Sequence, residues 1–139
     1  MTPLELMRIL GFSQMWPKLQ QDQFSTFRFE RRDSDWQLGE VVQVVFKPRS
    51  KEREVLGIAR IVSVEPRCMA RYGSNLSYPK VTDEEANADG FPDTPDKGIT
   101  GLTKLGYFQM WEWLWVIYGS KRLLEEPMNK ITLKWVERR

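Results

Sequence analysis

The sequence contains no histidine, and this absence removes several kinds of active site. Hydrolases built on a Ser-His-Asp or Cys-His arrangement need an imidazole as general base, and many zinc sites use histidine ligands. Only one cysteine is present, Cys68, so the chain cannot form an internal disulfide, which fits a reducing compartment. Any catalysis must therefore rely on Asp, Glu, Lys, Arg, Tyr, Ser or Thr side chains.

Long hydrophobic runs and targeting signals are also missing. The most apolar stretch, residues 107–118, is interrupted by Gln109 and Glu112, whereas a bilayer-spanning helix needs about 20 apolar residues. The N-terminus has no basic stretch followed by an apolar run, which is the pattern of a signal peptide. We therefore expect a soluble, cytoplasmic protein that has no membrane partner.

The composition favours one folded domain over residues 1–139. Hydrophobic residues make up 41% of the 139 residues and aromatic residues 12%, which is too apolar for a disordered chain. Charge is nearly balanced, because 21 basic and 19 acidic residues give a net charge of +2. A basic face could bind a polyanion, but an ordinary mixed and solvated surface explains this balance as well.

Four segments have the pattern of β-strands. Alternating aromatic and polar residues at 24–30 predict a strand with three Phe side chains on one face. Residues 41–46 predict a buried strand, and residues 55–64 a third, in which Gly57 marks a bulge or a close approach of another backbone. We expect these three to form a meander that closes on itself, and residues 131–136 to form the final strand.

The N-terminal segment has helix signals. Thr2 and Glu5 form a capping pattern, and Gly11 predicts the end of this first helix. Residues 121–127 contain charged residues and end in proline, so we expect a loop before the final strand.

Two further helices are expected in the second half. Thr82 and Glu85 form a second capping pattern, which predicts a short acidic helix ending at Gly90. Residues 100–118 predict a longer helix packed heavily against the sheet. The alternating tryptophans of residues 111–115 also permit a strand.

Four pieces of the sequence, in this order, resemble the ASCH domain, a member of the PUA-like superfamily. They are Thr26-Phe27-Arg28, then Gly39-Glu40-Val41-Val42, then the strand that contains Gly57, and then Asp89-Gly90-Phe91 at the end of the acidic helix. The resemblance implies an α+β fold, a PUA-like mixed β-barrel with flanking helices. It also implies an RNA-linked role, as a binder of RNA or a modified nucleoside, a ribonuclease or a nucleoside hydrolase.

Acetylcytidine amidohydrolases of this kind use a Lys, a Thr and a Glu. Carried over to this chain, the catalytic positions are Thr26 and Asp89, and the position of the Lys holds Gln23. The carboxylate is kept but shortened. Gln23 can contact a ligand but cannot act as the positively charged activator of a threonine nucleophile.

The same residues support a pocket on chemical grounds. Arg28 offers a fork of donors, Asp89 accepts from amines or hydroxyls, and Thr26 contributes a hydroxyl, a set that can recognise a nucleobase edge or a sugar. A structural ion pair between Arg28 and Asp89 explains the two residues equally well.

A second candidate surface is basic. Basic residues lie near the ends of two predicted neighbouring strands. Trp36, also a candidate for ligand stacking, lies nearby in sequence. Basic residues together with an exposed aromatic ring suit the binding of single-stranded RNA. The alternative is a solvated hairpin tip softened by Glu52 and Glu54. The candidate nucleic-acid-binding residues are Arg31, Arg32, Lys47, Arg49, Lys51 and Arg53.

Three functions follow from these observations. The preferred one is a module that binds RNA or a nucleoside-like ligand without a cofactor. The second is a ribonuclease or nucleoside amidohydrolase in the same cleft; a nuclease would place a divalent metal near Asp89 and Glu85. The third is a protein-partner module that uses the tryptophan-rich helix. The sequence does not define the ligand or the oligomeric state.

Overall fold

The computed structural model describes residues 7–31, 33–70, 73–95 and 103–139. The chain forms two compact units. Unit 1 holds Met1–Ser25, Arg31–Val64 and Ile131–Arg139, and unit 2 holds Thr26–Glu30 and Glu65–Lys130. Strands β2 (Gln23–Phe29), β4 (Glu54–Arg67) and β7 (Met128–Arg138) contribute residues to both units. The expectation of a single domain over residues 1–139 stays a prediction.

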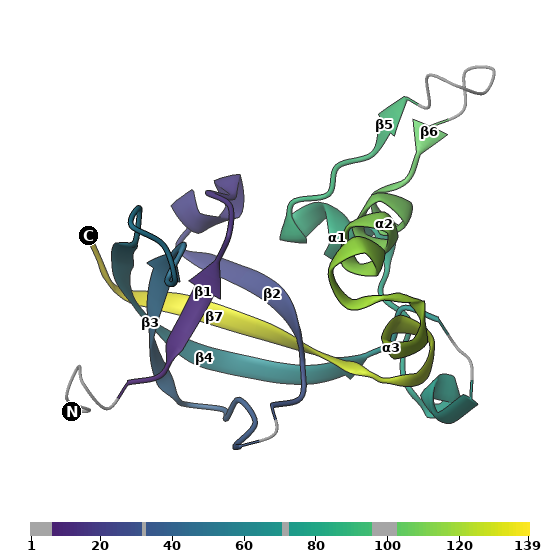
Figure 1. Ribbon diagram of the computed structural model, residues 1–139, viewed down its shortest axis with the longest axis horizontal. Helices are drawn as coiled ribbons and strands as arrows, with labels where there is room; N and C mark the ends of the chain where they lie inside the picture. Colours follow the sequence, from purple (N-terminus) through teal and green to yellow (C-terminus); the bar gives the residue numbers. More distant parts are fainter. Residues whose placement is uncertain (1–6, 32, 71–72, 96–102) are drawn as a thin grey trace. The chain divides into compact units, whose positions relative to one another are not determined.

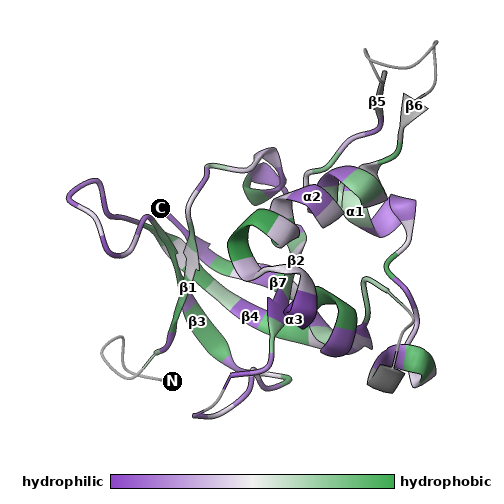
Figure 2. Ribbon diagram, turned by 45° about the vertical axis from the view of Figure 1, so that its right-hand side comes forward, coloured by the Kyte–Doolittle hydropathy of each residue, from purple (hydrophilic) through white to green (hydrophobic). Residues whose placement is uncertain are grey.

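A five-stranded sheet dominates unit 1, and its strand order is β1-β3-β4-β7-β2. Strand β1 (Ile9–Phe12) pairs in parallel with β3 (Val41–Phe46), which pairs antiparallel with β4. The sheet is curled like part of a barrel (Figure 1), and β3 is hydrophobic along most of its length (Figure 2). The mixed α+β class and the barrel-like sheet are thus confirmed, as is the buried strand at residues 41–46.

Gly57 combines both features that the sequence suggested for it. The β3–β4 register shifts beside it, because Val44 pairs with Gly57 whereas Val45 pairs with Val55. Its φ is +150°, and a Cβ placed there would overlap the carbonyl oxygen of Glu137 in β7. Gly57 therefore allows both a bulge and a close contact between strands.

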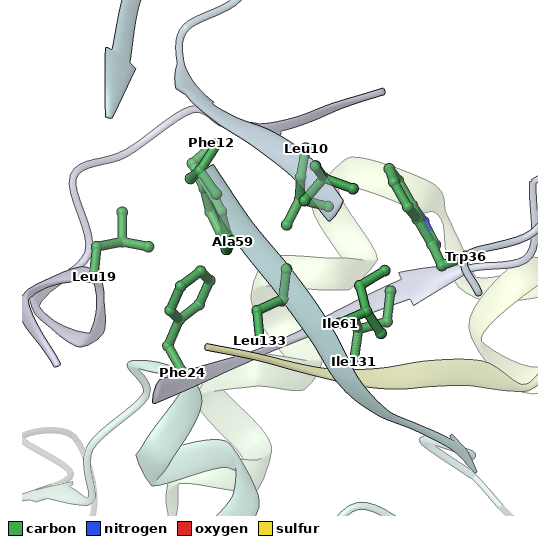
Figure 3. Close-up of a cluster of buried hydrophobic side chains, with 11 residues drawn as sticks. Leu10, Phe12, Leu19, Phe24, Trp36, Ala59, Ile61, Ile131 and Leu133 are labelled. Atoms are coloured by element: carbon green, nitrogen blue, oxygen red, sulfur yellow. The ribbon is translucent and has the colours of Figure 1, made fainter. Parts of the chain in front are cut away.

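The core of unit 1 is a cluster of apolar side chains between the strands of the sheet and the 3-10 helix η2 (Pro17–Gln20) (Figure 3). Phe24 anchors one side of it, with its ring 6.1 Å from that of Phe12 and 5.3 Å from that of Trp135. The buried members are Leu10, Phe12, Leu19, Phe24, Trp36, Val42, Val44, Ala59, Ile61, Ile131 and Leu133.

Two expectations about the N-terminal half, the first helix and the three-strand meander, are wrong. Residues Ile9–Phe12 form strand β1 and not the end of a helix, because their backbone pairs with β3; Thr2 and Glu5 lie outside the described residues. The prediction that three strands form a meander that closes on itself is also wrong, because β2 does not neighbour β3 in the sheet and β7 lies between β4 and β2.

The three Phe of β2 do not share one face. Phe24 belongs to the core of unit 1, whereas Phe27 and Phe29 are buried in unit 2. A spacing of three residues places side chains on opposite sides of a strand. All four residues from Phe24 to Phe27 are buried, so this part of β2 is covered on both sides.

Unit 2 is largely helical. The 3-10 helix η3 (Gly73–Ser77) precedes α1 (Asp83–Asp89), and a short β-hairpin of β5 (Thr94–Pro95) and β6 (Thr103–Lys104) precedes α2 (Gly106–Tyr118) and α3 (Ser120–Glu125). The capping box at the start of α1 is confirmed, because Glu85 N donates to Thr82 Oγ1 and Thr82 N donates to Glu85 Oε1, both at 3.1 Å. Gly90 ends the helix with a φ of +121°.

The long helix departs from its prediction in two ways. It is helical through the tryptophan run, so the strand interpretation is wrong, but it begins only at Gly106; residues 100–102 lie outside the described part. It is not heavily buried either, because Phe108, Trp115 and Val116 are exposed. Part of the predicted loop at 121–127 is helix α3, which Leu123 anchors by complete burial.

Candidate functional site

Strand β2 places Thr26 and Arg28 on the same face within unit 2. Alternation along a strand puts residues two apart on one side, and Arg28 Nε donates to Thr26 Oγ1 at 3.1 Å. Thr26 is buried, with 4% of its surface exposed. The hydroxyl oxygen thus accepts from the guanidinium, and the hydroxyl hydrogen can still be donated to another group.

Helix α1 places Asp89 in the same unit. Asp89 is the last residue of α1 and is 7% exposed, and the left-handed Gly90 follows it. A carboxylate at a helix C-terminus is disfavoured by the helix dipole, so its burial there requires compensation. The charge of Asp89 acts on Arg28, which connects the helix end electrostatically to β2.

Burial dominates the electrostatics of Arg28. Desolvation lowers the pKa of the Arg28 guanidinium, while Tyr118 and Asp89 act in the opposite direction. Arginine stays protonated in proteins, so the centre combines a partly buried cation with a buried carboxylate and a buried hydroxyl. Donors and acceptors of this kind can bind a planar polar group that presents both an acceptor and a donor.

Tyr118 acts electrostatically on Arg28, whereas Arg122 packs on the neighbouring Phe29 outside the group formed by Thr26, Arg28 and Asp89. The sequence did not single out either residue. The Tyr118 ring lies 4.8 Å from that of Phe29 in an edge-on arrangement. The Arg122 guanidinium lies 4.2 Å from the Phe29 ring centre and forms an ion pair with Glu126 at 3.2 Å. Tyr118 was hidden within an apolar run, and Arg122 within a segment predicted as a loop, so no local signal marked them.

The two other predicted ligand residues belong to unit 1. Gln23 is the first residue of β2 and is exposed. Trp36 does not suit base stacking, because only 6% of its surface is exposed and it is part of the core. The guanidinium carbons of Arg8 and Arg31 lie 4.5 Å and 5.1 Å from its ring centre.

Arg8 also links residues on either side of Trp36. Its Nε and Nη2 donate to the two carboxylate oxygens of Glu40 at 2.6 Å and 2.5 Å, and its other donors reach the carbonyl oxygens of Ser34 and Asp35. Such two-point guanidinium–carboxylate contacts fix geometry as well as charge. The apolar ring of Trp36 is thereby held in the core although the surrounding residues are polar.

The predicted basic residues do not form one cluster. Arg31 packs on Trp36, before the start of β3, whereas Lys47 follows the end of β3. A strand of this length separates its two ends by about 20 Å. Arg31 also binds Asp33 through two contacts of 3.0 Å, and Lys47 binds Glu52 at 2.6 Å. Arg32 lies outside the described residues.

Three exposed cations remain together at the turn between β3 and β4. Arg49, Lys51 and Arg53 are all exposed, and Arg53 Nη1 donates to the Pro48 carbonyl oxygen at 3.3 Å. Glu52 belongs to the same turn and lowers its net charge. This turn can make phosphate contacts through side chains that are already in solvent.

Glu85, which the nuclease hypothesis places near a metal with Asp89, is engaged in an ion network with Arg67 and Lys130. Its carboxylate accepts from Arg67 Nε at 3.1 Å and from Lys130 Nζ at 2.9 Å. Burial alone raises the pKa of Glu85, but Lys130, the Thr82 amide and Arg67 outweigh it and lower that pKa. Among the described residues, no group of three or more His, Cys, Asp or Glu is placed to hold a metal ion.

The chain matches no known family model, no curated protein and no solved structure. None of the helices in the described ranges is long and apolar enough to cross a bilayer.

Proposed function

We propose that this protein binds RNA or a modified nucleoside, and that Thr26, Arg28 and Asp89 recognise the base. The observation that carries this proposal is the partly buried Arg28 guanidinium, which donates to the buried Thr26 hydroxyl and feels the charge of the buried Asp89. A partly desolvated cation gives up less water than an exposed one when a ligand arrives, so its hydrogen bonds to a ligand are stronger.

The donor and acceptor pattern suits a base edge. A guanidinium donates to the carbonyl oxygens and ring nitrogens of bases, and a carboxylate accepts from their amino groups. Because the charges of Arg28 and Asp89 balance each other, the pair favours a neutral planar group over a free anion.

Phosphate contacts come from the exposed turn of unit 1. Arg49, Lys51 and Arg53 can neutralise the backbone of a single strand, which is held mainly by such contacts. A basic turn of this kind is by itself a feature of proteins that bind a polyanion, which is why we favour RNA as the ligand.

The ASCH-like, PUA-like assignment is part of the same proposal. The Thr26-Phe27-Arg28 strand and the Asp89-Gly90-Phe91 helix end supply the proposed base contacts, and an ASCH-like domain is RNA-linked. Catalysis has less support, because the place of the amidohydrolase lysine is taken by the exposed Gln23. We therefore favour binding over hydrolysis.

Incubation with a mixed-sequence single-stranded RNA separates these two activities. The wild type and Asp89→Asn are compared with and without Mg²⁺ or Mn²⁺, on native gels for binding and on denaturing gels for cleavage. We expect the wild type to shift the RNA and leave it intact. Cleavage that disappears in Asp89→Asn would make the protein a nuclease and contradict the proposal.

The salt dependence of binding tests the turn between β3 and β4. A triple variant with Arg49, Lys51 and Arg53 changed to Gln should reduce the slope of log affinity against log salt by about 2, since each phosphate contact contributes about 0.7. Arg60→Gln, an exposed cation on β4, is the control and should change little. An unchanged slope in the triple variant would remove the turn from the interface.

A further inference from the structure

Helix α2 carries an exposed apolar face that the proposed function does not use. Phe108, Trp115 and Val116 are exposed by 54%, 44% and 85%, and Leu105, just before the helix, by 38%. On a helix of 3.6 residues per turn Phe108, Trp115 and Val116 point to one side, opposite the buried Met110 and Leu114, while the exposed Ile117 lies off this side in the last turn. Large apolar side chains gathered in this way mark an interaction surface more often than a solvated one.

The helix is held firmly, so the face is fixed in position. Gly106 N donates to Asp93 Oδ1 at 2.6 Å and Tyr107 N donates to Asp83 Oδ1 at 3.2 Å, which caps the first turn. The Tyr107 hydroxyl donates to the Met69 carbonyl oxygen. A preorganised surface loses little conformational entropy when a partner binds.

The spacing of the face is that of a helix-packing seam. Phe108, Glu112 and Trp115 follow one another at intervals of four and three residues, as do successive d, a and d positions of a heptad. Glu112 is exposed and occupies the centre of this seam. A second helix is the natural occupant of such a seam, and it must accommodate one carboxylate among apolar residues.

A second copy of this chain fits poorly. A two-fold pairing of α2 with its copy, parallel or antiparallel, brings the two Glu112 carboxylates within about one helical turn of each other, where like charges repel.

We propose that the outward face of α2 binds an amphipathic helix of another protein that presents one Lys or Arg to Glu112 among its apolar residues. A carboxylate accepts about four hydrogen bonds, so the partner's cation adds to the contacts that Glu112 already makes. The apolar side chains supply most of the affinity, and the charge selects the partner and its register.

The test uses a set of labelled helical peptides of about three heptads, with leucine at a and d positions and one central a position varied. Binding to the full chain is measured by fluorescence anisotropy. We expect the peptides with a central Lys to bind at least about tenfold more tightly than those with a central Glu, and Glu112→Lys to reverse this preference. Val116→Asp should abolish binding, whereas Val136→Asp, a change at an exposed valine of β7, should leave it unchanged.

Three results would overturn the proposal. The first is that no peptide binds at about 100 µM to protein whose circular dichroism spectrum is that of a folded chain. The second is equal binding of the Lys and Glu peptides. The third is a dimer in sedimentation velocity that Val116→Asp dissociates, which would mean that a second copy covers this face.

Discussion

Replacing Gly57 by alanine tests the close approach of β7 to β4 in unit 1. Gly57 has a φ of +150°, and an added Cβ would overlap the Glu137 carbonyl oxygen and lie 3.0 Å from both Arg138 Cα and Trp135 Cζ3. The positive φ alone costs about 1–2 kcal/mol in any other residue. Two of the three neighbouring atoms are backbone of β7, so the strand itself must move, and overpacking of this kind costs about 1–3 kcal/mol more. Gly57→Ala should therefore lower the free energy of unfolding by about 2–5 kcal/mol.

Gly39→Ala is the matched control for this prediction. Gly39 also has a positive φ, +86°, but no atom lies within 4 Å of an added Cβ. Gly39→Ala should therefore lower the free energy of unfolding only by the cost of a positive φ, about 1–2 kcal/mol. Urea denaturation followed by far-UV circular dichroism and tryptophan fluorescence measures both. Equal losses within about 0.5 kcal/mol would refute the close approach of β7 to β4.

Three other predictions concern unit 2. Thr82→Ala removes one half of the capping box of α1 and should cost about 1 kcal/mol in urea denaturation, against no change for Thr82→Ser. The folded-state pKa of Glu85 is lowered, so the carboxylate stabilises the fold above its ordinary pKa of 4.5, and this contribution is lost as the pH falls through the lower folded value. Glu85→Gln should therefore flatten the acid limb of a plot of stability against pH. An unchanged acid limb would contradict the ion network. Burial, aided by Cys68 and Asp83, raises the pKa of Tyr107 to about 12, so the stability of the fold should decrease as the pH rises from 10 towards 12. Tyr107→Phe should abolish this decrease. At neutral pH the same variant should cost about 1 kcal/mol, because the hydrogen bond to the Met69 carbonyl oxygen is lost.

Local signals predicted the elements whose ends are set by neighbouring residues. Thr82, Glu85 and Gly90 are enough to define α1, because a capping box and a left-handed glycine act within one helical turn. The valine-rich run at 41–46 formed the expected buried strand, and Gly57 had the expected bulge and close approach. Each of these features is set by residues close together in the sequence, or by a backbone conformation that only glycine adopts easily.

Elements decided by distant partners were missed. Leu10 and its neighbours fit a helical pattern, but pairing between Ile9 and Gln43 makes this segment a strand. Helix α3 is short and has no side-chain cap; the burial of Leu123 and the bonds from Asn75 Nδ2 to the carbonyl oxygens of Leu124 and Glu126 support it. None of these contacts is visible as a local pattern.

In the candidate site, too, residues marked by local patterns were predicted and residues placed by distant contacts were missed. The sequence placed Thr26 and Arg28 on one strand and Asp89 at a helix end, and the structure joins Arg28 to both through a hydrogen bond and an electrostatic interaction. Tyr118 was missed because an aromatic residue in an apolar run is indistinguishable from core. The basic residues were wrongly grouped, since the length of β3 keeps Arg31 away from the turn that follows the strand.

RNA affinity of two arginine variants in unit 2 tests the central claim most directly. Arg28→Gln removes the guanidinium that bonds to Thr26, whereas Arg122→Gln removes a guanidinium that stacks on Phe29 outside the proposed base contacts. Arg28→Lys keeps the charge but not the fork, and circular dichroism verifies that each variant is folded. With a labelled single-stranded RNA in an anisotropy titration, we predict that both Arg28 variants bind at least about tenfold more weakly than the wild type. Arg122→Gln should stay within about twofold of the wild type. A wild type that does not bind, or Arg28 and Arg122 variants that lose the same affinity, would contradict the account.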